Sequence, residues 1–349
     1  MENRADLLSM TANELKQFVI GLGEPAFRSG QIMQWLCKGA AFSEMTNLSA
    51  SLREKLSAQA VLHYPVIEGR YASRLDSTVK YLFRLSDGQL IESVLMEYEH
   101  GLSICVSSQA GCRMGCRFCA STLGGKVRDL LPSEILGQII VAQKDAGKRI
   151  SNIVLMGIGE PLDNYDHVIR FLRLVSAPEG LNIGCRHISL STCGLVPAIY
   201  RLANEDLPIT LSISLHAYDD EVRSRIMPVN RAYNIDRLLT ACRDYFDQTG
   251  RRISFEYTLI AGENDSTDGA TELARLLKRY LEKRPFHVNL IPVNPVKERG
   301  YAASGKRSVR AFCETLERLG VNATVRRTLG EDINAACGQL RHTAGQDTE

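Results

Sequence analysis

The first part of the chain, up to about residue 85, places its apolar residues at helical spacing. Three short segments repeat this pattern, at residues 14–22, 28–40 and 51–58. Thr11 and Glu14 precede the first segment as a capping box, in which each side chain bonds the backbone N–H of the other residue. We therefore predict a small helical accessory domain over residues 1–85, which serves either as a scaffold or as a docking surface for substrate.

From about residue 88 onward, short runs of β-branched and apolar residues alternate with helical segments. The runs cover residues 102–108, 152–159, 187–192, 209–217, 252–260, 287–293 and 323–328. The helical segments between them cover residues 132–147, 165–175, 235–246, 269–281 and 307–320. Strands that alternate with helices indicate a parallel sheet, and this many units favour a full or partial barrel. We predict an α/β domain over residues 86–349, with functional residues at the carboxyl ends of its strands.

Composition narrows the function classes only slightly. The chain has 349 residues and a formal net charge of +2, which neither demands nor excludes a nucleic-acid partner. No apolar run reaches the roughly 18 residues that a membrane helix needs, and the first residues lack a secretory signal. We expect a cytoplasmic protein with no membrane association. Its ten cysteines then indicate metal binding or catalysis more than disulfides.

The most specific motif is "CRMGCRFC", which follows the first of the predicted strands. Its three cysteines, Cys112, Cys116 and Cys119, are spaced C-x3-C-x2-C and can hold one soft metal centre. A [4Fe–4S] cluster held by three cysteines keeps one iron open for a further ligand. A closed zinc site needs four ligands and could recruit Cys105, so both alternatives stay open on spacing alone.

The spacing of this motif resembles that of the radical S-adenosylmethionine (SAM) enzymes. The resemblance implies a partial (β/α)6-type barrel, in which the open iron binds SAM and an electron from the cluster cleaves it to methionine and a 5′-deoxyadenosyl radical. Polar and glycine residues at the predicted strand ends fit the same cofactor, although each alone has an ordinary explanation as a turn, a helix cap or a core residue. These strand-end positions are Gly159, Glu160, Ser191, Ser214, Leu215, His216 and Asn294.

A longer series of motifs narrows the resemblance further. The segments "CVSSQAGCRMGCRFCASTLGG", "MGIGEP", "LSTCG", "SISLHA", "NLIPVNP" and "DINAACGQL" occur in this order between about Glu92 and Leu340. This series resembles the RlmN/Cfr family of radical SAM RNA methyltransferases. The segment "FRSGQIMQWL" is also similar to the accessory domain of that family.

The family resemblance implies a role for each of three further residues. Cys337 would accept a methyl group from one SAM and, after hydrogen abstraction by a radical from a second SAM, add to adenine in a transient RNA–protein crosslink. Cys105 would release the RNA by forming a transient disulfide with Cys337. Glu92 matches the proposed proton acceptor of the family, although without the resemblance it would be a strand carboxylate facing solvent. We also expect the segment around Cys337 to be a mobile loop after the last strand.

The continuation of the cysteine motif, "CASTLGGKVRDL", looks like the RlmN branch of the family. That branch implies methylation of adenine carbon 2 in 23S rRNA and in the tRNA anticodon loop, with an electron donor such as flavodoxin or ferredoxin. The alternatives are methylation of carbon 8, as in the Cfr branch, and a non-enzymatic RNA-binding protein with a four-cysteine zinc site. A monomer is the default expectation. Three basic pairs are candidates for phosphate contacts, at residues 251–252, 306–307 and 326–327.

Overall fold

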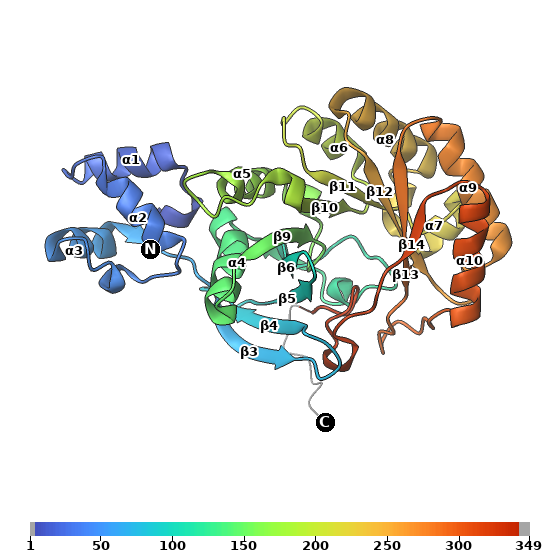
Figure 1. Ribbon diagram of the computed structural model, residues 1–349, viewed down its shortest axis with the longest axis horizontal. Coiled ribbons are helices and arrows are strands. Elements are labelled where there is room, and N and C mark those ends of the chain that lie inside the picture. Colours follow the sequence, from blue (N-terminus) through green and yellow to red (C-terminus); the bar gives the residue numbers. More distant parts are fainter. Residues whose placement is uncertain (1–3, 342–349) are drawn as a thin grey trace.

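The computed structural model describes residues 4–341, and its first part is a small helical module. The helices are α1 (Ala12–Gly21), α2 (Arg28–Leu36) and α3 (Ala50–Gln59), and two short parallel strands, β1 (Ala5–Asp6) and β2 (Ala60–Val61), close the module. The predicted capping box is present, because Thr11 and Glu14 bond each other's backbone N–H at 2.7 and 3.3 Å. The module projects from one side of the larger domain (Figure 1).

The larger domain is built on one sheet of ten strands in the order β14-β13-β12-β11-β10-β9-β6-β5-β4-β3. Neighbouring strands from β6 to β14 pair in parallel, which confirms the predicted parallel sheet and all of its predicted strands. These strands are β6 (Gly101–Cys105), β9 (Ile150–Leu155), β10 (Ile188–Thr192), β11 (Thr210–Ser214), β12 (Ile253–Leu259), β13 (Phe286–Pro292) and β14 (Ala323–Val325). The sheet curves into an open, partial barrel (Figure 1), as predicted.

Three antiparallel strands extend the sheet beyond β6. They are β3 (Val66–Ala72), β4 (Val79–Arg84) and β5 (Leu90–Tyr98). The first two lie in the segment that the sequence analysis assigned to the helical module, whose last helix ends at Gln59. None of these three strands was predicted. Strand β3 is an edge strand with mostly exposed or half-buried side chains, so it lacks the apolar run by which the parallel strands were predicted.

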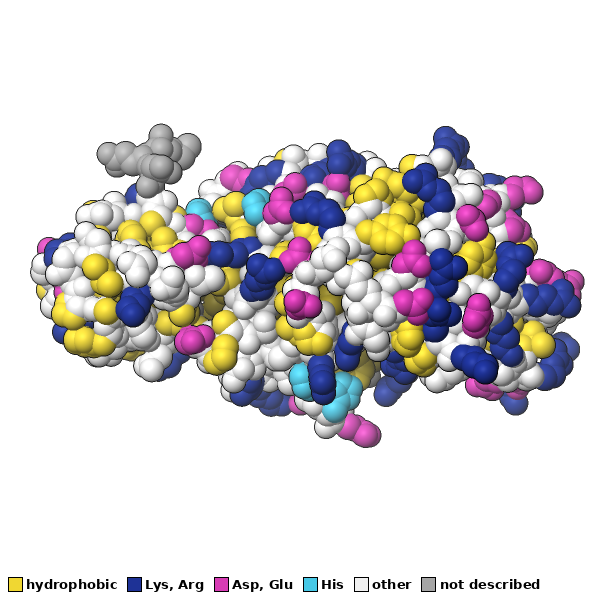
Figure 2. All heavy atoms as spheres, turned by 90° about the horizontal axis from the view of Figure 1, so that it is seen from above, with side chains coloured by type: hydrophobic (Ala, Val, Ile, Leu, Met, Phe, Trp, Pro, Cys, Tyr) yellow, Lys and Arg dark blue, Asp and Glu magenta, His cyan; other side chains and the backbone are white. Residues whose placement is uncertain are grey.

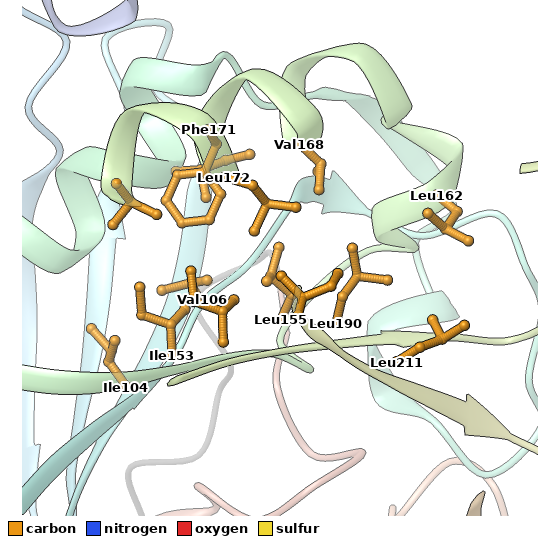
Figure 3. Close-up of a cluster of buried hydrophobic side chains, with 14 of the residues drawn as sticks. Ile104, Val106, Ile153, Leu155, Leu162, Val168, Phe171, Leu172, Leu190 and Leu211 are labelled. Carbon is orange, nitrogen blue, oxygen red and sulfur yellow. The ribbon is translucent and has the colours of Figure 1, made fainter. Parts of the chain in front are cut away.

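Helices pack against the outer face of the barrel (Figure 1). They are α4 (Pro132–Ala146), α5 (Tyr165–Ser176), α6 (Val196–Leu202), α7 (Asp220–Ile226), α8 (Ile235–Thr249), α9 (Thr267–Leu281) and α10 (Lys306–Arg318). Figure 3 shows Val168, Phe171 and Leu172 of α5 above the apolar side chains of four neighbouring strands. Helices α6 and α7 were not predicted, because seven residues are too few to establish a helical period.

Two irregular segments close the carboxyl end of the barrel. The first is a hairpin of β7 (Gln109–Gly111) and β8 (Lys126–Asp129), with the three cysteines of the C-x3-C-x2-C motif between its strands. The second follows β14 and contains a short 3-10 turn, Glu331–Ile333; we call its last part, residues 334–341, the Cys337 loop. Further 3-10 turns lie at Leu7–Ser9, Phe42–Glu44, Ala120–Thr122, Pro161–Asp163, Cys185–His187 and Pro228–Arg231.

The surface carries mixed charge. On the face shown in Figure 2, Lys and Arg side chains are interspersed with Asp and Glu. This distribution agrees with the small net charge of +2. None of the helices between residues 4 and 341 combines the length and apolarity that crossing a bilayer requires.

Candidate active site

One cavity at the carboxyl ends of the parallel strands gathers most of the residues singled out in the sequence. Its wall contains all three motif cysteines together with residues from the ends of β9, β10, β11 and β13 and from the Cys337 loop. The predicted site residues in this wall are Cys112, Cys116, Cys119, Gly159, Glu160, Ser191, Ser214, His216, Asn294 and Cys337. Strand ends of a parallel barrel converge on one rim, which is why residues spread over the chain meet here.

The three motif cysteines fit the ligand set of a cluster. Burial raises the pKa of the Cys112 thiol to about 12, and it raises the pKa of Cys116 and Cys119 as well. Such thiols ionise at neutral pH only when a cationic metal centre binds them. All three line one cavity, where each could bind a different iron of a [4Fe–4S] cluster.

Cys105 lies apart from the three motif cysteines. It ends β6 and packs with Val94, Ile158 and Ala335, whereas Cys116 belongs to a separate apolar group with Cys193. Burial raises the pKa of the Cys105 thiol to about 12; Cys337 adds to the rise and Arg326 opposes it. Cys105 is therefore a neighbour of Cys337 and not a fourth member of the motif, which removes the support for the four-cysteine zinc alternative.

Glu160 is held rigidly in the cavity wall by backbone groups. Its Oε1 accepts from the N–H of Leu162 at 3.0 Å and its Oε2 from the N–H of Cys193 at 2.7 Å. Its own N–H donates to the side chain of Gln109 at 2.9 Å. The preceding residue must be glycine, because Gly159 has φ +108° and a Cβ there would lie 2.7 Å from Gln109. The carboxylate is thus fixed at a strand end without a cationic side-chain partner in the part of the chain that the structure describes.

His216 presents a neutral imidazole to the cavity. Its Nδ1 accepts from the backbone N–H of Thr258 at 2.9 Å, so the proton of the neutral ring is on Nε2. Burial lowers the pKa of His216 to about 3, and the nearby charge of Arg223 adds to this effect. The ring meets Phe118 of the cysteine loop edge-on, with centroids 4.9 Å apart. His216 is therefore a donor at every pH near neutrality.

The remaining strand-end positions divide into two groups. The hydroxyls of Ser191 and Ser214 lie 3.4 Å apart on adjacent strands and both line the cavity. Asn294 also lines it, and its Nδ2 donates to the carbonyl of Cys337 at 3.0 Å. Leu215, in contrast, packs its side chain in the main hydrophobic core and does not reach the cavity.

The Cys337 loop is fastened to the domain through its backbone. The carbonyl of Gly338 accepts from the N–H of Ala120 at 2.7 Å, and that of Leu340 accepts from the hydroxyl of Ser121 at 2.8 Å. Both partners belong to the cysteine loop. Cys337 therefore lies in the wall of the same cavity as the motif cysteines, as the sequence analysis expected. Whether the loop is mobile stays a prediction.

Glu92 is buried on β5, not exposed to solvent. It pairs with Lys80 Nζ at 3.0 Å, and its Oε2 accepts from the backbone N–H of Arg341 at 2.7 Å. Burial raises the pKa of Glu92, although Lys80 and Arg341 oppose the rise. The carboxylate does not line the cavity; it contacts the end of the Cys337 loop.

Two charged cavity residues were missed or misassigned by the sequence analysis. Glu256 lies on β12 with its Oε2 accepting from Asn289 at 2.7 Å, and Arg326 follows β14 and points inward. A carboxylate within the apolar run "RISFEYTLI" was a usable signal for Glu256. Arg326 was assigned to a surface pair for phosphate contacts, yet only its neighbour Arg327 is exposed.

Comparisons with known proteins agree with this geometry. The sequence profile of the radical SAM superfamily matches residues 106–277, and that of the ribosomal RNA large subunit methyltransferase N-terminal domain matches residues 5–62. A probable dual-specificity RNA methyltransferase RlmN from Pelotomaculum thermopropionicum is 54% identical over 97% of this chain and 92% of its own length. One from Lachnospira eligens is 52% identical over 99% and 98%. The crystal structure of a radical SAM methyltransferase from Sphaerobacter thermophilus superimposes with a TM-score of 0.93 at 41% identity, covering 97% of this chain and 100% of that chain.

Proposed function

The chain belongs to the RlmN family of radical SAM RNA methyltransferases, and on this premise we propose that it methylates carbon 2 of adenine in 23S rRNA and in the tRNA anticodon loop. The observation that carries the proposal is the position of Cys337. Its loop brings one thiol into the same cavity as the three motif cysteines, with a second thiol, Cys105, as its neighbour. A methyltransferase that used SAM directly on its substrate would need neither extra thiol.

The cavity residues divide between the two cofactors that the superfamily uses. Cys112, Cys116 and Cys119 would hold the [4Fe–4S] cluster. The strand-end groups would hold SAM: the fixed carboxylate of Glu160 suits its ammonium group, and the donors at His216 and Asn294 suit its oxygen atoms. When bound, cluster and SAM supply a methyl group and the one-electron chemistry that an electron-poor aromatic carbon requires.

Cys337 and Cys105 would carry out the nucleophilic steps of the reaction. The Cys337 thiolate attacks the methyl carbon of SAM, so that a sulfur–carbon bond forms while the bond to the sulfonium breaks. After this carbon is joined to adenine, the Cys105 thiolate attacks the Cys337 sulfur. A disulfide forms, the sulfur–carbon bond breaks, and its electron pair goes to the carbon, which takes up a proton to become the new methyl group.

Glu92 is our candidate for the base that removes the ring proton of adenine. Its burial favours proton uptake, and it lies on the same face of β5 as Val94, which packs against Cys105. Its contact with the N–H of Arg341 means that the end of the Cys337 loop must shift before adenine reaches this carboxylate.

Replacement of the two thiols tests the proposal. Cys105→Ala should retain methylation of Cys337 and crosslinking but lose release, so RNA accumulates covalently on the protein. Cys337→Ala should form no adduct, and Cys313→Ala, on the outer helix α10, should turn over normally. Normal turnover by Cys105→Ala would contradict the resolving role. Mass spectrometry of the nucleoside product decides the carbon, since 8-methyladenosine without 2-methyladenosine would favour the Cfr-like alternative.

The remaining proposals concern the setting of the reaction. We propose a cytoplasmic monomer that receives its electrons from flavodoxin or ferredoxin. All ten cysteines are free thiols in the structure, which suits a reducing compartment. Reduction of the reconstituted protein by each donor, followed by electron paramagnetic resonance, tests the electron source, and size-exclusion chromatography tests the monomer.

A further inference from the structure

Arg326 is a half-buried cation in the wall between two hollows in the barrel. Its backbone N–H donates to the carbonyl of Leu290 on β13 at 2.8 Å, which continues the pairing of β14 and directs the side chain inward. Arg326 lines the cavity described above and a smaller hollow beside it. Cys337 and Asn294 also line both hollows, so Cys337 and Arg326 lie together in the wall that separates them.

The guanidinium of Arg326 has little compensation from the protein. Its Nη1 donates to the sulfur of Met156 at 3.4 Å, and a thioether is a weak acceptor. Within residues 4–341 it forms no ion pair with a carboxylate at 4 Å or less. A cation on a cavity wall gains from a nearby negative charge wherever water is partly excluded. Because Arg326 has no carboxylate partner among the described residues, it is available to an anion that is present during part of the reaction.

The groups around Arg326 identify that anion. Cys337 lines both hollows together with Arg326, and Met156, which bonds Arg326, packs in the same apolar group as Cys105. Glu256 accepts from Asn289 at 2.7 Å, and among the described residues it forms no ion pair with Arg326 at 4 Å or less. Tyr98 has a pKa raised by burial and stays a neutral phenol. The two thiols are left as the groups that become anionic when they react.

We propose that Arg326 is the positioning cation of the Cys337–Cys105 pair: its guanidinium balances the negative charge that each sulfur carries when it acts as a nucleophile. This inference rests on the proposed function of the two thiols. In the first step the Cys337 thiol loses its proton to solvent, its sulfur gains the methyl group, and S-adenosylhomocysteine leaves. Arg326 is unchanged by the step, but it faces a thiolate before the step and a neutral thioether after it.

The test measures thiolate reactivity directly. Cluster-loaded, SAM-free protein is treated with iodoacetamide at neutral pH, and the alkylation rates of the Cys337 and Cys105 peptides are followed by mass spectrometry. The variants are Arg326→Met, which keeps volume without charge, and Arg326→Lys, which keeps charge. Arg327→Met, at the exposed neighbouring residue, is the matched control. The rate of Cys313, on the outer helix α10, serves as an internal reference for reagent and folding.

A cation beside a reacting sulfur favours its anionic form, which is the form that iodoacetamide alkylates. We expect Arg326→Met to slow alkylation of Cys337 about tenfold, while Arg326→Lys and Arg327→Met stay within about twofold of the parent. Equal rates in Arg326→Met and Arg327→Met would overturn the proposal, as would an Arg326→Lys variant as slow as Arg326→Met. If Arg326→Met does not fold, Arg326→Gln takes its place with the same expectations.

Two further readouts separate this inference from other roles of Arg326. Methyl transfer to Cys337 in a single turnover should slow with the dissociation constant of SAM unchanged. A weaker affinity for SAM with unchanged alkylation would instead assign Arg326 to SAM binding and refute the proposal. Alkylation needs neither RNA nor turnover, so failure of the parent protein to methylate RNA would count against the proposed function and leave the test of Arg326 intact.

Discussion

Replacement of Arg223 provides the sharpest test of how the SAM site is held together. Arg223 lies on α7 with 0% of its surface exposed, and it links the ends of β10 and β11. It has no carboxylate partner among the described residues and bonds only neutral oxygen atoms. The acceptors are the carbonyls of Leu215 at 3.0 Å, Cys193 at 2.7 Å, Ser214 at 3.1 Å and Tyr233 at 3.3 Å, and the Asn230 side chain at 2.9 Å.

The change Arg223→Met removes all of these donors and fills most of the space. Each buried acceptor left without a partner costs about 1–3 kcal/mol, although neighbouring losses do not add in full. Relief of the buried charge offsets part of the loss. We expect the free energy of unfolding to fall by about 3 kcal/mol or more, which is a large share of the roughly 5–15 kcal/mol that stabilises a domain. SAM affinity should fall as well, because Ser214 and Cys193 adjoin the cavity.

Urea unfolding under anaerobic conditions measures the stability, and equilibrium dialysis with labelled SAM measures the affinity. Arg225→Met is the matched control on the same helix, since Arg225 has 46% of its side chain exposed and pairs only with surface glutamates. This control should change stability by about 0.5 kcal/mol or less. If Arg223→Met were as stable as Arg225→Met, the carbonyls around Arg223 would not depend on its guanidinium, and the reasoning would be refuted.

Three other predictions follow from the cavity wall. Gly159→Ala should lower the free energy of unfolding by about 2–4 kcal/mol and weaken SAM binding in a dialysis assay, because a Cβ at φ +108° would meet Gln109 at 2.7 Å. SAM binding equal to that of the wild type would contradict this prediction. His216 takes up its proton near pH 6.5 in the unfolded chain but only near pH 3 in the folded chain, where burial lowers its pKa. The free energy of unfolding therefore falls as the pH drops between these values. His216→Asn should flatten this part of the plot of urea midpoint against pH. Anaerobic reconstitution should load about four iron and four sulfide per chain into the parent and into Cys242→Ala but almost none into Cys116→Ala; zinc loading would contradict the cluster.

Local patterns were sufficient to predict the barrel. The parallel strands are short segments rich in β-branched and apolar residues; β10 and β11, for example, place Ile and Leu at every second position and bury them, and this signal does not depend on distant contacts. The cavity residues could be predicted for the same reason, since they directly follow such runs. Edge strand β3 lacks the signal because solvent covers much of it. Its membership in the sheet depends on pairing with β4, which no local pattern encodes.

Side-chain direction was harder to predict than position. Arg326 and Arg327 form one basic pair in the sequence, but successive residues of an extended segment point to opposite sides, so one enters the cavity and the other meets solvent. Leu215 lies between Ser214 and His216, which both line the cavity, and its side chain joins the core instead. Without the family resemblance, Glu92 would have been a strand carboxylate facing solvent, but it is buried on β5, and its ion pair with Lys80 comes from β4, a strand that the sequence analysis did not predict.

The small residues before Cys337 let its loop pack closely. Ala335 and Ala336 are 7% and 6% exposed, whereas Cys337 itself is half-buried and lines the cavity. The loop is held by the carbonyls of Cys337, Gly338 and Leu340 and by the N–H of Arg341, and among residues 4–341 none bonds the Cys337 sulfur.

Because the Cys337 loop is held through its backbone, its thiol could meet SAM and adenine in turn, as the proposed function requires. Asn294, Ala120, Ser121 and Glu92 hold the backbone of the Cys337 loop. Gln339 Nε2 also donates to the carbonyl of Pro295 at 3.3 Å, and Arg341 pairs with Glu298 at 2.7 Å. Each hydrogen bond contributes about 0.5–1.5 kcal/mol net, so lifting the whole loop costs several kcal/mol, and the lifted state is populated to less than about 3%. Under the proposed function, lifting the loop would free the amide of Asn294 for SAM and the carboxylate of Glu92 for adenine together, because the loop backbone bonds both. Contacts with RNA would then supply the free energy that lifts the loop away from Glu92.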